Sequence, residues 1–267
     1  MANNSSQKSE TRDFIAFLIK LGLFVVILRS FIVSPFNIPS ESMQPRLMVG
    51  DYLLVAKWPY GFSKYSMPFN VPVIPGRLLA HAPEKGDVVV FKAPPSVRDD
   101  YIKRVIGLSG DIIQVTDGVV SVNGNAIQQE KIEDFTHLLS PNSPCYREEY
   151  EAANDRGEQI CRYPQFLETL PNGKSYKVLD VTEGSEGDNT EAFVVPDGYM
   201  FLMGDNRDRS ADSRFPAEDG EAIGMVPQEN LVGRALVSVF STDGSSVWYK
   251  PWTWFTAARW NRIGEGF

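Results

Sequence analysis

The sequence predicts a mainly β protein, with a single N-terminal transmembrane helix, a β-rich core and a second β subdomain inserted into that core. One apolar run, residues 14–33, is long enough to cross a bilayer, which requires about 20 apolar residues. Between residues 36 and 240, short apolar runs are separated by Gly, Pro and Asp, and no long segment has the 3.6-residue period of a helix. A more polar stretch within this region holds both cysteines.

The N-terminal part is predicted as a short cytoplasmic tail, residues 1–12, followed by a transmembrane anchor, residues 13–35. Lys20 and Arg29 interrupt the apolar run, but each can extend its charge toward the nearer membrane face. A cleaved signal peptide and a buried helix are the alternatives. Ser34-Pro35 is a poor cleavage site after the apolar run, so a single uncleaved span is the preferred interpretation.

The core is predicted in two parts, residues 36–124 and residues 196–245. Hairpin turns are indicated by Asp117-Gly118 and Asn123-Gly124. The expected strands share a short apolar pattern between turn residues, and they are 52–56, 88–91, 101–106, 112–115, 119–122, 200–202 and 231–240.

Residues 125–195 are predicted to form the inserted subdomain. Cys145 and Cys161 lie close in this polar stretch, at a spacing that suits one loop-closing disulfide, although two free thiols are the alternative. A disulfide would indicate an oxidising compartment. Lys8 and Arg12 before the span are matched by Arg46 and Lys57 after it, so the distribution of positive charge does not indicate the orientation of the span. The expected disulfide favours a C-terminal part outside the cytoplasm, and this orientation is inferred.

The C-terminal segment, residues 246–267, is rich in aromatic residues beside Arg259 and Arg262. Aromatic side chains with cations suit a membrane interface. A terminal segment that covers the β core is an equally good interpretation, and both remain open.

Composition argues against several functional classes. The net charge of −8 disfavours nucleic-acid binding, which relies on basic patches. The two histidines, His81 and His137, have no further zinc-ligand types in a persuasive arrangement, so no metal site is expected, and neither suggests a Ser-His-Asp hydrolase. No cofactor is implied, and any hydrolase here needs another base.

Three segments carry candidate chemistry. Ser40 and Ser42 lie between two prolines that stiffen the chain just after the span, although serines in loops are more often turn formers. Lys103 lies in an expected strand with Tyr101 and Val105 on its own face, where burial would lower its pKa, although a lysine reaching solvent is the simpler alternative. Residues 203–214 alternate Asp and Arg, which favours mutual ion pairing over a calcium loop or a solvated loop.

Together these segments resemble the ordered motif set of bacterial type I signal peptidases. The resemblance covers most of residues 14–240 and follows an N-terminal anchor. The motifs that carry it are Pro39-Ser40-Glu41-Ser42-Met43-Gln44-Pro45, Gly50-Asp51 with Val55, Lys85-Gly86-Asp87-Val88-Val89-Val90-Phe91, Tyr101-Ile102-Lys103-Arg104 with Gly107 and Gly110-Asp111, and Gly204-Asp205-Asn206-Arg207-Asp208 through Ser210, Asp212, Ser213 and Arg214.

The resemblance implies roles for particular residues. Ser42 matches the nucleophile and Lys103 the general base of a Ser–Lys dyad. Ser40 matches the side-chain donor of the oxyanion hole, which the Ser42 N–H completes, and Ser210 matches the hydroxyl that orients the lysine. The remaining matches are structural support from Asp205, Arg207, Asp212 and Arg214, and a substrate pocket formed by Phe36, Ile38, Met43, Leu47, Tyr101 and Ile102.

The resemblance also implies a membrane-bound endopeptidase that removes signal peptides from exported preproteins through an acyl-enzyme, after small-x-small sequences. The expected location is the bacterial inner membrane, with one span and the catalytic part on the periplasmic side, near lipid and the export translocon. A narrow-substrate peptidase and an inert membrane-tethered binding domain are the rivals. Glu41 stands where many members have Gly, Arg46 stands where they have Thr, and some relatives have two spans.

Overall fold

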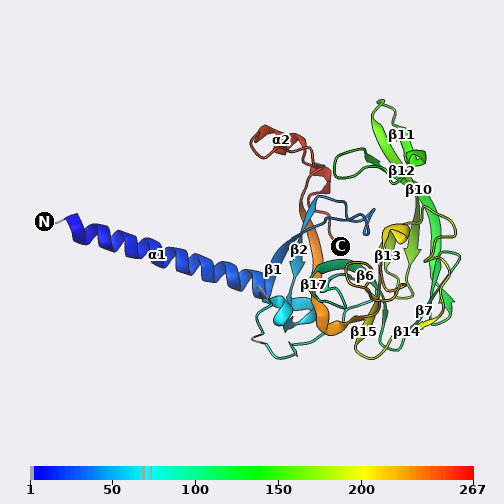
Figure 1. Cartoon of the computed structure of the whole chain (residues 1–267), viewed down its shortest axis with the longest axis horizontal. Coiled ribbons are helices and arrows are strands. Elements are labelled where there is room, and N and C mark those ends of the chain that lie inside the picture. Colours follow the sequence, from blue (N-terminus) through cyan, green and yellow to red (C-terminus); the bar gives the residue numbers. More distant parts are fainter. Residues whose placement is uncertain (1–2, 68–69, 73) are drawn as a thin grey trace.

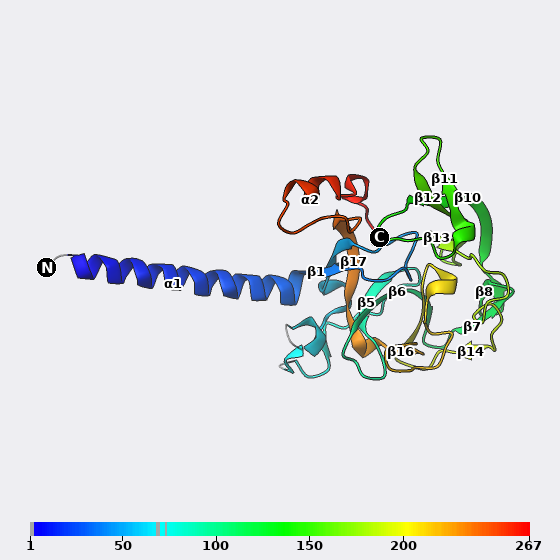
Figure 2. The same ribbon diagram turned by 45° about the horizontal axis from the view of Figure 1, so that its top comes forward.

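A computed structural model describes residues 3–67, 70–72 and 74–267 of the chain. A single long helix projects from a β-rich body (Figures 1 and 2). The helix α1 spans Asn3–Ile27 and continues as a π-helical turn, η1, over Leu28–Ile32. Residues Glu10–Ile32 are long and apolar enough to cross a membrane, and most of their large apolar side chains are exposed. The predicted fold class, mainly β with one N-terminal apolar helix, is confirmed.

The ends of the anchor differ from the prediction. The helix starts at Asn3, so most of the polar tail is helical rather than irregular. At the other end the helix stops at Ile32, and residues expected in the anchor form a strand, β1, over Val33–Asn37. Pro35 explains the change, because it lacks an N–H and disfavours a helical conformation at Ser34.

The body is built on a seven-stranded sheet in which every neighbouring pair is antiparallel. The strand order across the sheet is β1 (Val33–Asn37), β2 (Asp51–Ala56), β17 (Leu231–Ser241), β5 (Val88–Lys92), β6 (Asp100–Leu108), β15 (Tyr199–Met203) and β16 (Val226–Pro227). The strand β1 therefore lies at one edge, and β6 lies in the interior of the sheet.

Within the described residues, three smaller sheets complete the body. The first has the strand order β14 (Phe193–Val194), β7 (Ile112–Thr116), β8 (Val119–Val122) and β9 (Asn125–Ala126). The second has the order β10 (Gln128–Leu138), β12 (Gln159–Thr169) and β11 (Glu151–Ala153), and β13 (Ser175–Leu179) also pairs with β12. The third pairs β3 (Phe62–Ser63) with β4 (Arg77–Leu78). The short helices are η2 (Trp58–Tyr60), η3 (Lys64–Ser66), η5 (Glu148–Tyr150), η6 (Arg207–Arg209), η7 (Gln228–Asn230), α2 (Trp252–Thr256) and η8 (Trp260–Arg262).

The inserted subdomain is more tightly joined to the core than its predicted boundaries suggest. The turn at Asn123-Gly124 connects β8 to its partner β9, and β14 pairs with β7, so one sheet combines strands from both sides of the predicted boundary at residue 124. One hydrophobic cluster also joins Ile113 of this sheet and Val178 of β13 to Phe201 of the large sheet. The 125–195 segment is thus an extension of a shared core.

The C-terminal segment has a buried side and an exposed side. Arg262 is buried and donates to both oxygens of Asp51, while Phe267 packs against the core cluster beneath β1 and β2. The outward side chains are aromatic, and they are Trp248, Tyr249, Trp252, Trp254, Phe255 and Trp260. Both views place α2 at the end of the body from which α1 projects (Figures 1 and 2).

Candidate active site

The loop between β1 and β2 carries Ser42. Hydrogen bonds between Ile38 and Asp51 and between Gly50 and Ile38 close the base of the loop. Met43 and Leu47 are fully buried in the core cluster under β1 and β2. Their apolar burial fixes the loop from below, so Ser42 is held beside a rigid anchor.

The strand β6 carries Lys103 from the other side. Lys103 is paired with Val89 of β5, and the pairing of β6 with β15 ends at Arg104, one residue away. At this point the chain after β15 turns away at Gly204. A side chain at Gly204 would collide with the carbonyl oxygen of Ser42 and with Ser210, so only glycine allows this close approach.

These two elements bring Ser42 and Lys103 into direct contact. The Lys103 Nζ lies 2.5 Å from the Ser42 Oγ. Both residues are buried, with Lys103 4% exposed and Ser42 6% exposed. Burial lowers the pKa of Lys103 to about 8, against a smaller opposing effect of Asp212 and Asp205. A lysine with this pKa supplies neutral amine near neutral pH, which is what a general base requires.

Ser40 lies beside the nucleophile. The two hydroxyl oxygens, Ser40 Oγ and Ser42 Oγ, are 3.4 Å apart. Among the residues that the structure describes, the backbone N–H of Ser42 donates no hydrogen bond, while its carbonyl accepts one from the Asn206 N–H. A hydroxyl and an uncommitted N–H beside a buried serine could therefore bind an oxyanion.

The 204–214 loop is held by ion pairs, but its pairing differs from the expected pattern. Asp212 and Arg214 pair within the loop, with Arg214 Nε 2.9 Å from Asp212 Oδ1. Asp205 instead accepts two hydrogen bonds from Arg104 of β6. Arg207 pairs with the fully buried Glu168 of β12. The loop is thus fixed to two strands as well as to itself.

Ser210 is buried close to Gly204, 5% exposed. In the described part of the chain its hydroxyl makes no hydrogen bond to Lys103. The lysine-orienting role therefore remains a proposal.

A cavity of about 320 Å³ opens beside Ser42 and Lys103. Four of the six expected pocket residues line this cavity, and they are Phe36, Ile38, Tyr101 and Ile102. The other two, Met43 and Leu47, do not line it, because the loop directs both side chains into the core. The prediction that Met43 and Leu47 line the substrate pocket is therefore wrong, and both residues instead anchor the loop.

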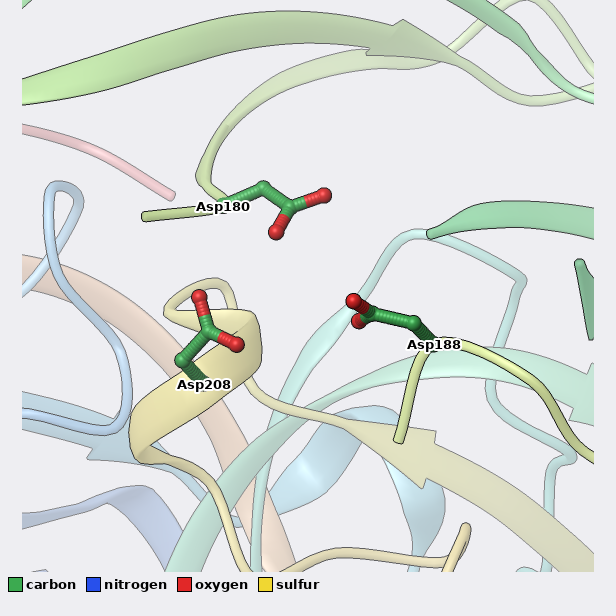
Figure 3. A group of neighbouring side chains, drawn as sticks. All are labelled: Asp180, Asp188 and Asp208. Carbon is green, nitrogen blue, oxygen red and sulfur yellow. The ribbon is translucent and has the colours of Figure 1, made fainter. Parts of the chain in front are cut away.

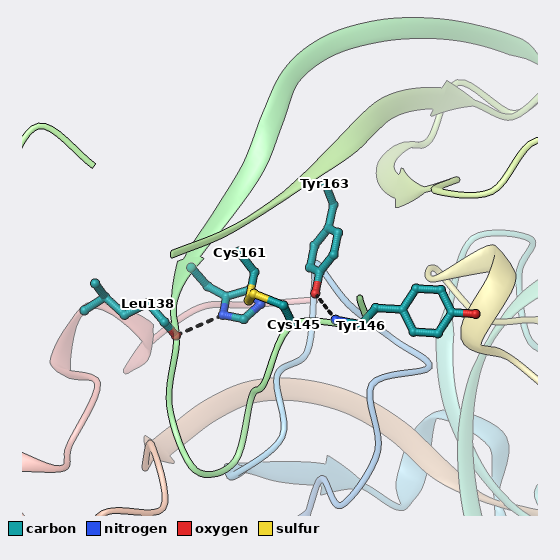
Figure 4. The surroundings of a disulfide bond; sticks show 6 residues. Leu138, Cys145, Tyr146, Cys161 and Tyr163 are labelled. Atoms are coloured by element: carbon teal, nitrogen blue, oxygen red, sulfur yellow. Dashed lines mark hydrogen bonds between the residues drawn. A yellow bond between two sulfur atoms is a disulfide. The ribbon is translucent and has the colours of Figure 1, made fainter. Parts of the chain in front are cut away.

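Glu41 and Arg209 connect the two loops above the dyad. Glu41 Oε2 lies 3.4 Å from Arg209 Nε, and the Arg209 guanidinium lies over the Tyr146 ring at 4.5 Å. Tyr146 follows Cys145, which is disulfide-bonded to Cys161, and its N–H donates to the Tyr163 hydroxyl (Figure 4). The disulfide-bearing subdomain therefore reaches the serine loop through Arg209.

An acidic group that the sequence did not reveal joins the 204–214 loop, through Asp208, to two other segments. Asp180, Asp188 and Asp208 converge from three segments, with carboxylate oxygens within 4.8 Å of one another (Figure 3). Asp208 accepts the N–H groups of Val181 and Thr182, and Asp188 accepts from Ser185. Burial, followed by the charges of Asp208 and Asp188, raises the pKa of Asp180 to about 6. Partial protonation of Asp180 thus relieves the repulsion between these carboxylates.

The two histidines lie outside the cavity beside Ser42. His81 is exposed and its ring contacts the Leu79 carbonyl. His137 lies in β10 of the inserted subdomain, where its ring Nδ1 lies 3.0 Å from the Leu138 carbonyl oxygen, and burial lowers its pKa. Lys103, and neither histidine, contacts the Ser42 hydroxyl.

Comparison with known proteins identifies the family. A family model described as signal peptidase, peptidase S26, matches residues 11–240. The chain belongs to this family. It is 35% identical over 248 residues to a signal peptidase I of Rickettsia typhi, covering 90% of this chain and 84% of that protein. It is 36% identical over 247 residues to a signal peptidase I of Rickettsia conorii, covering 90% and 82%.

A crystal structure of a signal peptidase I from Enterococcus faecalis is a more distant likeness, with 23% identity and a TM-score of 0.29, covering 58% of this chain and 97% of that one. Membership of the S26 family confirms the resemblance stated from the motifs. The chain is therefore a serine peptidase of the signal peptidase I type. The N-terminal apolar helix fits a membrane-anchored member of the family.

Proposed function

We propose that this signal peptidase removes signal peptides from exported preproteins with a Ser–Lys dyad, in which Ser42 is the nucleophile and Lys103 the general base. The observation that carries the proposal is the 2.5 Å contact between the Ser42 hydroxyl and the buried Lys103 amine. No metal or organic cofactor takes part in the proposed reaction.

The proposed reaction begins with neutral Lys103. Its amine accepts the Ser42 proton while the Ser42 oxygen attacks the scissile carbonyl carbon. The negative charge that develops on the carbonyl oxygen is stabilised by the Ser42 N–H and the Ser40 hydroxyl; loss of one such donor typically costs about 2.7–4 kcal/mol of transition-state stabilisation. Protonated Lys103 then gives its proton to the leaving amine, and the neutral amine activates water to hydrolyse the acyl-enzyme.

The shape of the site supports an extended substrate. The strand β1 is at the edge of the large sheet, and Phe36 within it and Ile38 just after it line the cavity beside Ser42. An extended peptide can pair with such an edge and place alternate side chains into pockets. The limited volume, about 320 Å³ for the whole cavity, favours small residues before the scissile bond. This supports cleavage after small-x-small sequences.

The position of the anchor supports action at a membrane. Ser42 lies only ten residues beyond Ile32, where the candidate span ends. A serine at this distance is close to the bilayer surface, where the end of a signal peptide's apolar segment emerges. We place the protein in the bacterial inner membrane as a single-pass protein, with the disulfide-bearing body on the periplasmic side and with lipid and the export translocon nearby.

The experiment that tests the proposal is preprotein cleavage by the full chain in lipid, comparing the parent with Ser42→Ala and Lys103→Met. We expect both variants to fold and neither to cleave the preprotein. A matched control is Lys64→Met, because Lys64 is exposed and does not line the cavity. Appreciable turnover by Ser42→Ala or Lys103→Met would disprove the dyad.

A further inference from the structure

A second cavity of about 320 Å³ lies where the anchor joins the body. Three cationic side chains line it: Arg29 from the π-helical turn, Lys57 directly after β2, and Lys92 at the end of β5. Asp100 is the single carboxylate in its lining. The volume is within the range of small-ligand pockets, about 300–1,000 Å³.

Lys57 is the unusual member of this group. The residue is 3% exposed, yet its ammonium makes no hydrogen bond or ion pair with any residue in the described ranges. Its ammonium lies over the Phe36 ring, whose centroid is 5.6 Å away. Burial lowers the Lys57 pKa to about 8, and the neighbouring Lys92 and Arg29 lower it further, against the opposing charge of Asp100. A buried cation without an anionic partner is unfavourable by several kcal/mol.

The carboxylate in the cavity is already engaged by another cation. Asp100 Oδ1 lies 3.1 Å from Lys92 Nζ, which also donates to the Arg98 carbonyl. Lys57 and the exposed Arg29 therefore retain uncompensated positive charge on one side of the cavity. An anion would complete this arrangement by accepting hydrogen bonds that no described side chain accepts.

The position of the cavity indicates which anion is available. The candidate span ends at Ile32, and the backbone N–H of Lys57 donates to the Ile32 carbonyl. Lys57 is thus fixed at the level where the helix leaves the hydrocarbon, which is the level of the lipid phosphates. We propose that this cavity binds a phosphate group, with Lys57 as its main contact and Arg29 and Lys92 as supporting cations.

Two sources could supply this phosphate, a phospholipid headgroup or free inorganic phosphate. The cavity shares Phe36 and Asp100 with the cavity beside Ser42. A phospholipid bound here would therefore fix the height of the active-site cavity above the bilayer. This site is independent of the proposed cleavage chemistry, because neither Ser42 nor Lys103 contributes to it.

The test uses the full chain purified in a non-ionic detergent. Bound lipid is counted by native mass spectrometry after titration with phosphatidylglycerol, and the unfolding temperature is followed in parallel. A second titration uses inorganic phosphate, and a third uses diacylglycerol, which lacks the phosphate. Lys57→Met removes the main contact, and Lys64→Met is the matched control, because Lys64 is an exposed lysine of the same region outside the cavity.

We expect phosphatidylglycerol to bind the parent and the Lys64→Met variant alike, and Lys57→Met to weaken binding about tenfold, the effect of losing one charge-assisted contact. Binding of diacylglycerol should not differ between the parent and the Lys57→Met variant. A phosphate response without a phosphatidylglycerol response would identify free phosphate as the ligand, provided that Lys57→Met abolishes it. Equal binding by parent and Lys57→Met, or an equal loss in Lys64→Met, would overturn the proposal.

Discussion

Lys103 is a lysine whose surroundings favour its neutral form. A pKa of about 8 leaves roughly a tenth of the amine neutral at pH 7, whereas an ordinary lysine has less than about 0.1%. Burial causes this shift, and Asp212 and Asp205 limit it. We expect kcat/KM to rise with pH through about 8, measured with a peptide that has no group titrating between pH 6 and 10. A rise of kcat/KM centred near pH 6 or below would contradict the role of Lys103 as the general base.

The same lowered pKa affects stability. Between pH 8 and 10.5 the unfolded chain binds more protons at Lys103 than the folded protein, so this site reduces stability below pH 8, and the reduction disappears as pH rises through the unfolded value. The lowered pKa of Lys103 corresponds to about 3 kcal/mol of lost stability at pH 7. A substitution of Lys103 would recover this free energy but would also remove the hydrogen bond to Ser42, which is worth about 1 kcal/mol.

We therefore expect Lys103→Met to be inactive but more stable than the parent at pH 7, by about 2 kcal/mol in the free energy of unfolding. Denaturant unfolding at pH 7 and pH 10.5 measures this effect. The advantage of the variant should shrink at the higher pH. A variant that is less stable at pH 7 would show that Lys103 is not desolvated in the folded protein.

Asp180 provides a second titration test. Its pKa is raised to about 6, so the folded protein favours its protonated form, and stability from this site is present below pH 4 and lost as pH rises through about 6. We expect Asp180→Asn to raise the unfolding temperature at pH 7.5 by about 2–4 °C, the shift that 1 kcal/mol produces in a domain of this size. The gain should vanish at pH 4. Glu151→Gln, an exposed carboxylate of β11, is the control.

For individual residues, the sequence was sufficient to predict some members of the site and insufficient to predict others. Ser42 and Lys103 could be predicted because each lies in a short motif whose local pattern is recognisable. The partners Arg104 and Glu168 could not, because ion pairs between distant strands leave no signal at either position. Met43 and Leu47 were misplaced because the direction of a loop side chain depends on how the loop folds back.

At the scale of elements, the 204–214 loop is fixed to the inserted subdomain by one buried ion pair. Glu168 of β12 is fully buried and pairs with Arg207, which is 4% exposed. Removing one partner of such a pair leaves an uncompensated buried charge, which costs about 3–5 kcal/mol. The loop in turn contacts the Ser42 carbonyl through the Asn206 N–H.

We therefore expect Glu168→Gln to lower stability by about 3 kcal/mol and to reduce kcat more than it raises KM, because displacement of the loop disturbs the dyad. Denaturant unfolding and steady-state kinetics on one preparation measure both effects. A matched control is Glu158→Gln, an exposed glutamate just before β12. Normal stability in Glu168→Gln would show that the Arg207 charge is compensated by another group.

The predicted strands of the core follow the structure closely because half-buried strands alternate in polarity. Residues 112–115 fall within β7, where Ile113 and Val115 are buried and Ile112 is exposed. The long strand β10 could not be predicted, since it has few buried residues and a mostly polar sequence. It pairs along most of its length with β12, and a local pattern does not reveal such pairing.

At the scale of the whole molecule, the arrangement of the strands depends on contacts between distant segments. The strand β17 lies between β2 and β5, although about 140 residues of chain separate it from β5. This order is what places β1 at a sheet edge and β6 inside the sheet. The anchor, in contrast, could be predicted from composition alone, because a bilayer sets the length of the helix that crosses it.

The C-terminal segment packs on the core, as one of the two interpretations of the sequence expected, while the membrane-interface interpretation stays a prediction. Two of its cationic side chains, Arg259 and Arg262, are directed inward, where Arg262 binds Asp51, whereas Lys250 is exposed. Its aromatic side chains remain outside, with Trp248 82% and Phe255 67% exposed. The helix α2, which carries several of these rings, lies at the end of the body from which α1 projects (Figure 2).

Four of the five tryptophans belong to this segment, so tryptophan emission reports on it. We expect the emission of the full chain in nanodiscs to be quenched by about half when the lipids carry bromine in their acyl chains, since interfacial side chains enter roughly 5–10 Å below the headgroups. All samples carry Trp58→Phe, because the exposed Trp58 follows Lys57 at the junction with the anchor and would itself be quenched by lipid. Replacing Trp248 and Trp252 with Ser should reduce the quenching. Emission that is insensitive to brominated lipid would place the aromatic surface in water, and its exposure would then require a protein partner to explain it.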